Sequence, residues 1–97
     1  MTTESTLRHE ITVVIKDKTG FHTRTAAIFA KQAGAFDCTV RVRHQNKKNA
    51  DGKSMLGLMS LGVKTNAHIT IVAEGSDAKE AVAALRELVE KDFGAEL

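Results

Sequence analysis

The sequence predicts an α+β fold, a two-layer open-faced β-sandwich in which a four-stranded antiparallel sheet is covered on one face by three helices. Three segments alternate apolar and polar residues, as strands with one buried face do, and three other segments repeat apolar residues at helical spacing. In chain order they give βαββαβα within 97 residues, the length of one domain. We therefore expect residues 1–97 to form a single domain, with residues 1–7 as a flexible polar tail.

The alternation that predicts the strands is regular in three places. The residues expected on the buried face are Ile11, Val13 and Ile15, then Cys38, Val40 and Val42, then Ile69, Ile71 and Ala73. Their polar neighbours are expected to face solvent. A weaker fourth candidate, residues 47–53, is expected to pair with the second strand through a turn at Gln45 and Asn46.

Three helices are expected to cover the apolar face of this sheet. Their apolar positions span residues 26–33, 54–61 and 78–89. Ser76 or Asp77 is suited to cap the third helix, because short polar side chains accept hydrogen bonds from the first turn.

Composition excludes several classes of function. The chain has 14 basic and 12 acidic residues and four Phe as its only aromatic residues, which argues against a nucleic-acid interface. Cys38 is the only cysteine, so an internal disulfide and a multi-cysteine metal site are excluded. No apolar run has the length of a membrane span, and the N-terminus lacks the apolar stretch of a signal peptide. We expect a cytoplasmic protein without metal, cofactor or membrane insertion, and nothing in the sequence requires a dimer.

The most informative segment joins the first strand to the first helix and reads Gly20-Phe21-His22-Thr23-Arg24-Thr25. His22 falls at or near the helix N-cap, where main-chain N–H groups have no intrahelical partners and the helix dipole favours an anion. We expect the N–H groups of Thr23 and Thr25 to bind phosphate and Arg24 to clamp it. A histidine there can take a phosphoryl group and give it away again. The simpler alternative is that His22 is only a polar helix cap.

The second helix predicts a docking surface and a capping serine. At 100° per residue, Leu58 and Leu61 share one side of the helix, and a second stripe holds Met55, Leu56 and Met59. A short helix on a sheet buries one stripe, so we expect the Met-rich one, together with Phe21, to contact partner proteins. Ser54 precedes this helix and is well suited to cap it.

These two segments resemble the two signatures of the HPr family, the histidine-containing phosphocarriers of the bacterial phosphoenolpyruvate:sugar phosphotransferase system. Gly20-Phe21-His22-Thr23-Arg24-x-Ala26-Ala27 resembles the active-site signature, and residues 53–62 resemble the signature around the regulatory serine. The resemblance runs from about Glu10 to about Phe93. It implies phosphorylation of His22 at Nδ1 by enzyme I, with Arg24 as the phosphate clamp, and transfer onward to EIIA domains of sugar permeases. It describes a carrier rather than an autonomous enzyme.

The resemblance also implies regulation. Ser54 would be phosphorylated by an HPr kinase/phosphorylase, and the outward stripe of the second helix would contact enzyme I, EIIA domains and a transcriptional regulator. The sequence departs from the family at Thr25, where Pro is usual. We expect the site to survive this change, with the Thr25 hydroxyl as a further group that can face phosphate.

Two alternatives remain open from the sequence. The first is a regulatory phosphocarrier of the nitrogen-related branch, which uses the same histidine relay. The second is a small-molecule-sensing βαβ module, which would bind a metabolite tightly without covalent chemistry.

Overall fold

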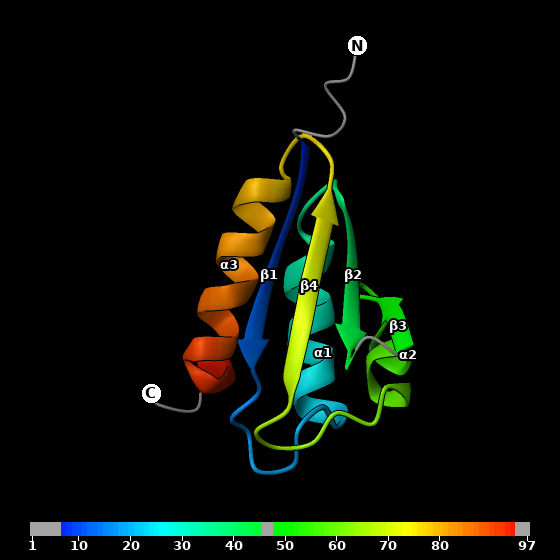
Figure 1. The fold of residues 1–97 in the computed structure, drawn as a ribbon, viewed down its shortest axis with the longest axis vertical. Helices are drawn as coiled ribbons and strands as arrows, with labels where there is room; N and C mark the ends of the chain where they lie inside the picture. The colour runs from blue at the N-terminus through cyan, green and yellow to red at the C-terminus, as the bar shows by residue number, and fades with distance from the viewer. Residues whose placement is uncertain (1–6, 46–47, 95–97) are drawn as a thin grey trace.

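The computed structural model describes residues 7–45 and 48–94 and confirms the predicted fold class and order of elements (Figure 1). The strands are β1 (Arg8–Val14), β2 (Thr39–His44), β3 (Lys48–Asp51) and β4 (His68–Glu74). The helices are α1 (Thr23–Gly34), α2 (Met55–Ser60) and α3 (Ala78–Glu90), followed by the short 3-10 helix η2 (Asp92–Gly94). Residues 1–6 of the expected tail, and Asn46 of the expected turn, lie outside the described residues.

The four strands form one antiparallel sheet in the order β1-β4-β2-β3. Strand alternation separates its faces: Val40 and Ile71 are fully buried under the helices, whereas Thr12 and Thr70 on the open face are paired across β1 and β4. The Oγ1 atoms of these two threonines are 3.0 Å apart. The predicted inward and outward faces of the strands are therefore those of the structure.

The fourth strand is shorter than the segment predicted for it. β3 ends at Asp51 because the chain turns there: the Lys53 N–H donates to Asp51 Oδ1 at 2.9 Å, and the Ser54 N–H donates to the Asp51 carbonyl oxygen at 3.0 Å. Of the predicted range 47–53, Lys47 lies outside the described residues.

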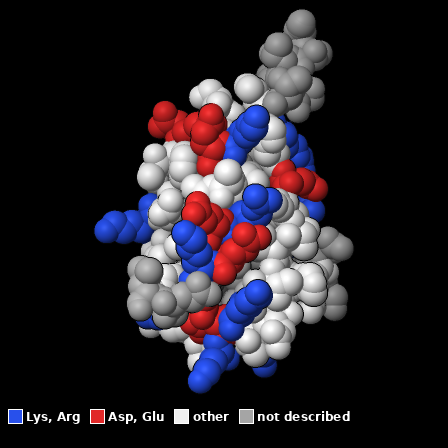
Figure 2. Space-filling model, turned by 90° about the vertical axis from the view of Figure 1, so that its left-hand side faces the viewer, with Lys and Arg blue, Asp and Glu red and all other residues white. Residues whose placement is uncertain are grey.

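The helices bury one stripe each against the sheet and expose the other. The buried residues are Thr25, Ala26, Phe29 and Ala33 of α1, and Ala78, Ala81, Val82, Leu85 and Val89 of α3. On the outer surface over α3, basic and acidic side chains alternate without a patch of one sign (Figure 2). They include an i,i+4 pair in which Lys91 Nζ lies 3.0 Å from Glu87 Oε2. None of the helices in the described part of the chain has the length and apolar character needed to cross a bilayer.

Asp77 stands at the N-cap of α3, as predicted, but its side chain makes no capping hydrogen bond. Its carboxylate accepts instead from the Asp37 N–H at 2.8 Å and the Cys38 N–H at 2.9 Å. The bond from the Asp37 N–H is the main reason that the pKa of Asp77 lies below its ordinary value. Burial, with help from Asp77, raises the pKa of the Cys38 thiol to about 11. Asp77 thus ties the entry to β2 to the start of α3.

Candidate functional site

The loop between β1 and α1 is held in place by main-chain contacts to the segment between α2 and β4. The Phe21 N–H donates to the Val63 carbonyl oxygen at 3.1 Å, and the Ile15 N–H donates to that of Ala67 at 2.9 Å. Gly20 adopts φ +71°, and a Cβ there would overlap the Val63 carbonyl. Glycine is therefore required at this position both for the backbone conformation and for the close approach of the two segments.

Phe21 anchors the loop in the core. Its ring is buried and packs edge-on against Phe29 at a centroid distance of 5.5 Å and against Phe93 at 6.2 Å. The expectation that Phe21 belongs to the docking surface is therefore wrong. Its large apolar ring is more stable between two other rings than in solvent, and it holds the next residue, His22, at the surface.

His22 is the N-cap residue of α1, as the sequence predicts. Its backbone is extended, and its carbonyl accepts the first helical bond, from the Ala26 N–H at 2.9 Å. Among the described residues, the main-chain N–H groups of Thr23, Arg24 and Thr25 donate to no main-chain carbonyl. The N–H of Thr25 is turned toward the His22 side chain in the manner of a capping box, without a hydrogen bond between them. The start of α1 thus leaves N–H groups without main-chain partners next to His22, whose side chain is 35% exposed.

The Thr25 hydroxyl stabilises the turn that carries His22. It accepts from the His22 N–H at 3.1 Å and donates to the Gly20 carbonyl oxygen at 2.7 Å. Thr25 is fully buried, so the expectation that its hydroxyl can face phosphate is wrong. Both of its hydrogen-bonding directions are already used to brace the turn.

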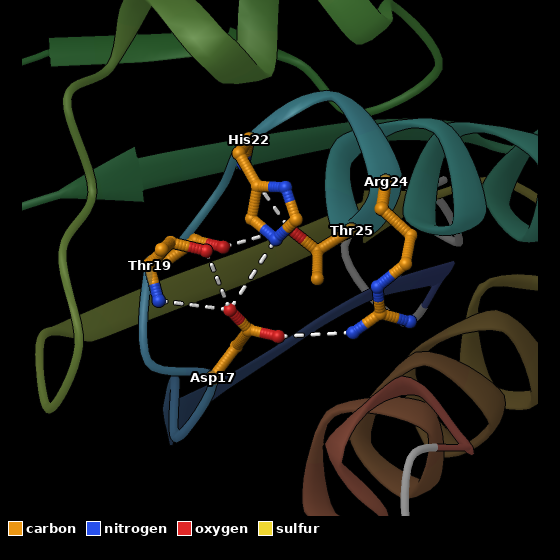
Figure 3. A network of polar contacts seen from close by, with 6 residues as sticks. Asp17, Thr19, His22, Arg24 and Thr25 are labelled. Carbon is orange, nitrogen blue, oxygen red and sulfur yellow. Dashed lines mark hydrogen bonds and ion pairs between the residues drawn. The ribbon is translucent and has the colours of Figure 1, made fainter.

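Asp17 is the site residue that sequence reasoning missed. Its Oδ1 lies 3.3 Å from His22 Nε2 and accepts from both the N–H and the hydroxyl of Thr19 at 2.9 Å, while its Oδ2 accepts from Arg24 at 3.0 Å (Figure 3). Asp17 is the only acidic residue between Glu10 and Asp37, and it lies in the loop after the first strand. A single acidic residue in the loop that carries a candidate nucleophile was the sequence feature that could have identified Asp17 as part of the site.

The Asp17 carboxylate is ionised despite its position. Burial raises its pKa, but the hydrogen bonds from Thr19, the nearby His22 and the bond from Arg24 together outweigh burial and bring the pKa below its ordinary value. A negative charge therefore sits between the imidazole and the guanidinium at neutral pH.

Arg24 lies beside His22, as predicted for a phosphate clamp, but here it binds Asp17. Its side chain is 46% exposed, so part of the guanidinium remains open to solvent. Figure 3 shows the imidazole between Asp17 on one side and the first turn of α1 on the other. Nε2 faces the carboxylate, and the other ring nitrogen is turned toward the start of the helix.

The second predicted motif forms α2 and its cap. Ser54 is the N-cap, and its Oγ accepts from the Gly57 N–H at 3.0 Å. Leu58 is fully buried, whereas Leu56 is 74% exposed and Met55 is 36% exposed. Met59 is partly buried and packs against the core. The exposed part of the predicted stripe is therefore narrower than expected and consists mainly of Met55 and Leu56.

The comparisons with known proteins agree with these observations. A family described as the PTS HPr component phosphorylation site matches residues 9–91. The phosphocarrier protein HPr of Mycoplasma pneumoniae is 43% identical over 82 residues, which cover 84% of this chain and 93% of that protein. The HPr-like protein Crh of Halalkalibacterium halodurans is 39% identical, over 82% of this chain and 94% of its own length.

Solved structures give the same result for the fold. The crystal structure of HPr-C-His from Thermoanaerobacter tengcongensis superposes with a TM-score of 0.86 at 44% identity, covering 92% of this chain and 99% of that one. Sequence and fold therefore match over nearly the whole length of these relatives, and the chain belongs to the HPr family of phosphocarrier proteins.

Proposed function

We propose that this protein carries a phosphoryl group on Nδ1 of His22, which it accepts from phospho-enzyme I and passes to EIIA domains of sugar permeases. The observation that carries the proposal is the partly exposed imidazole at the N-cap of α1, with Arg24 beside it. Open N–H groups at a helix start bind phosphate oxygens, and a guanidinium adds a planar pair of donors.

The proposed chemistry follows from this placement. The lone pair of Nδ1 attacks phosphorus, and the bond from phosphorus to the donor nitrogen breaks, with its electron pair returning to the donor. The phosphoryl group then lies against the N–H groups of Thr23 and Thr25, and Arg24 turns from Asp17 to the phosphate oxygens. The same groups stabilise the phosphate in both directions of transfer, which suits a carrier.

The test is the intact mass after incubation with phosphoenolpyruvate and enzyme I. We expect the parent protein to gain about 80 Da, the mass of one phosphoryl group, and to lose it in acid. His22→Ala should gain nothing. His68→Ala removes an exposed histidine at the start of β4 and should behave as the parent does. An unchanged mass of the parent, or phosphorylation of His22→Ala, would contradict the proposal.

We propose further that Ser54 is phosphorylated by an HPr kinase/phosphorylase. Its hydroxyl caps α2 next to the exposed Met55 and Leu56, so a phosphate there would add negative charge to the docking surface. With this kinase and ATP, the parent and Ser60→Ala should incorporate phosphate, and Ser54→Ala should not. The Ser60 hydroxyl also lies on α2 and donates to the Gly57 carbonyl at 2.7 Å, which makes Ser60→Ala a matched control. Labelling of Ser54→Ala would mean that another hydroxyl is the target.

We propose that the carrier acts as a cytoplasmic monomer. The helices cover the apolar face of the sheet, so that face needs no second copy of the chain to bury it. Sedimentation at concentrations of enzyme assays should give the mass of one chain, 10.5 kDa. A mass of twice that value would contradict the proposal.

A further inference from the structure

The Asp17 carboxylate contacts both of the residues to which the proposed function assigns the chemistry. The Asp17 side chain is only 11% exposed, and the oxygen nearest the ring accepts two hydrogen bonds from Thr19. These two bonds hold the carboxylate in place without help from His22 or Arg24. Within the described chain, Asp17 is the only carboxylate in ion-pair contact with the His22 ring.

Resting on the proposed function, we infer that Asp17 is a positioning residue for phosphoryl transfer: its carboxylate keeps the proton of the neutral His22 ring on Nε2, so that Nδ1 presents the attacking lone pair. An ionised carboxylate can only accept a hydrogen bond. Its Oδ1 lies 3.3 Å from Nε2, so a small rotation of the ring completes an N–H···O bond there. The nitrogen that carries no proton is then Nδ1, which is turned toward the open N–H groups of α1.

The same carboxylate serves the phosphorylated state. When Nδ1 forms its bond to phosphorus, the ring becomes positively charged while Nε2 keeps its proton. The ion pair between that ring and Asp17 becomes stronger, because the carboxylate now faces a full charge. Arg24, bound to the other oxygen at 3.0 Å, is released toward the phosphate. On transfer to an acceptor, the bond to phosphorus breaks, its electrons return to Nδ1, and the Nε2 proton has not moved.

The first test concerns the free protein and does not depend on any partner. Nitrogen-15 NMR of the imidazoles distinguishes a ring nitrogen with a proton from one without. In the neutral ring of the parent, we expect His22 to carry its proton on Nε2. Asp17→Asn removes the charge at nearly constant volume and should give a mixture with the Nδ1–H form. A parent ring protonated mainly on Nδ1, or an unchanged ring in Asp17→Asn, would overturn the inference.

The second test concerns phosphohistidine. Of the charged groups at the site, Asp17 contacts the ring and Arg24 is bound to Asp17, so the expected change is assigned to this pair. With phosphoramidate as a chemical donor, the hydrolysis of phospho-His22 is followed against pH. The protonated, labile form should persist to higher pH in the parent than in Asp17→Asn, with the midpoint about one pH unit lower in the variant. Coincident profiles would overturn the inference.

Control variants distinguish the loss of a positioning role from a defect in folding. Asp51→Asn removes a carboxylate that also accepts from the N–H two residues later, but it lies at the end of β3, outside the ion pairs of His22 and Arg24, and should match the parent in both tests. Asp17→Glu restores the charge and should recover part of the effect. Because phosphoramidate replaces enzyme I, failure of the relay and failure of the Asp17 inference give different results.

Discussion

At the scale of single residues, the candidate site contains two polar side chains that contact other residues of the site. The Thr25 hydroxyl hydrogen-bonds to the main chain of Gly20 and His22. The two oxygens of the Asp17 carboxylate contact the side chains of His22 and Arg24. Neither has to touch phosphate. The Thr25 hydroxyl makes two hydrogen bonds within this turn, which Pro, the usual residue at this position in the family, has no hydroxyl to make.

This account predicts the effect of removing the Thr25 hydroxyl. Thr25→Val keeps the shape of the side chain but leaves the Gly20 carbonyl and the His22 N–H without their partner. We expect the free energy of unfolding to fall by about 1–2 kcal/mol, in the range of a lost cap or a buried hydrogen bond. Urea denaturation measures it. Thr25→Ser keeps the hydroxyl, so equal losses in the two variants would contradict the role given to the hydrogen bonds.

At the scale of elements, two segments far apart in the sequence form the site together. The loop after β1 passes so close to the segment after α2 that only a glycine fits, and the Phe21 N–H joins the two at Val63. The segment that directly follows the second signature therefore supports the loop of the first one through main-chain contact.

Gly20, in the loop before α1, and Gly34, the last residue of α1, provide a matched test. Gly20→Ala must place a Cβ in the Val63 carbonyl at a positive φ, and should destabilise the fold by at least about 2 kcal/mol. Gly34→Ala adds a Cβ in open space at the last residue of α1, and should stabilise it by about 0.4–1 kcal/mol. The midpoint temperatures of thermal unfolding measure both changes in stability. A stable Gly20→Ala would show that the two segments do not meet as closely as described.

At the scale of the whole molecule, one face of the sheet is covered by helices and the site lies at one end of that layer. The core takes Leu58 from α2, while Leu56 on the same helix stays in solvent. The exposed Leu56 and its neighbour Met55 together support the proposed contact surface on α2. This arrangement separates the residues that hold the fold from those proposed to meet partners.

The two leucines therefore have opposite predicted effects. Leu58→Ala should lower the free energy of unfolding by about 2–5 kcal/mol, because it leaves a cavity in the core. Leu56→Ala should change it by less than about 0.5 kcal/mol and weaken binding to enzyme I. Denaturation and isothermal titration calorimetry measure the two effects. Unimpaired binding by Leu56→Ala would place the docking surface elsewhere.

The sequence by itself determined the features that depend on neighbours along the chain. Alternation and helical spacing predicted the strands and helices, and the residue types at 22 and 54 predicted two helix caps, because a cap or a turn is formed within four residues. The inward Leu58 and the outward Leu56 follow from the same periodicity.

Only the tertiary structure decided how the loop before α1 is used. Phe21 is in the core because Phe93, from the other end of the chain, completes its packing. The loop in which Asp17 meets His22 and Arg24 is held against the segment after α2 by main-chain contacts to Val63 and Ala67. Such contacts depend on the path of segments more than 40 residues apart, and no local pattern of residue types records that path.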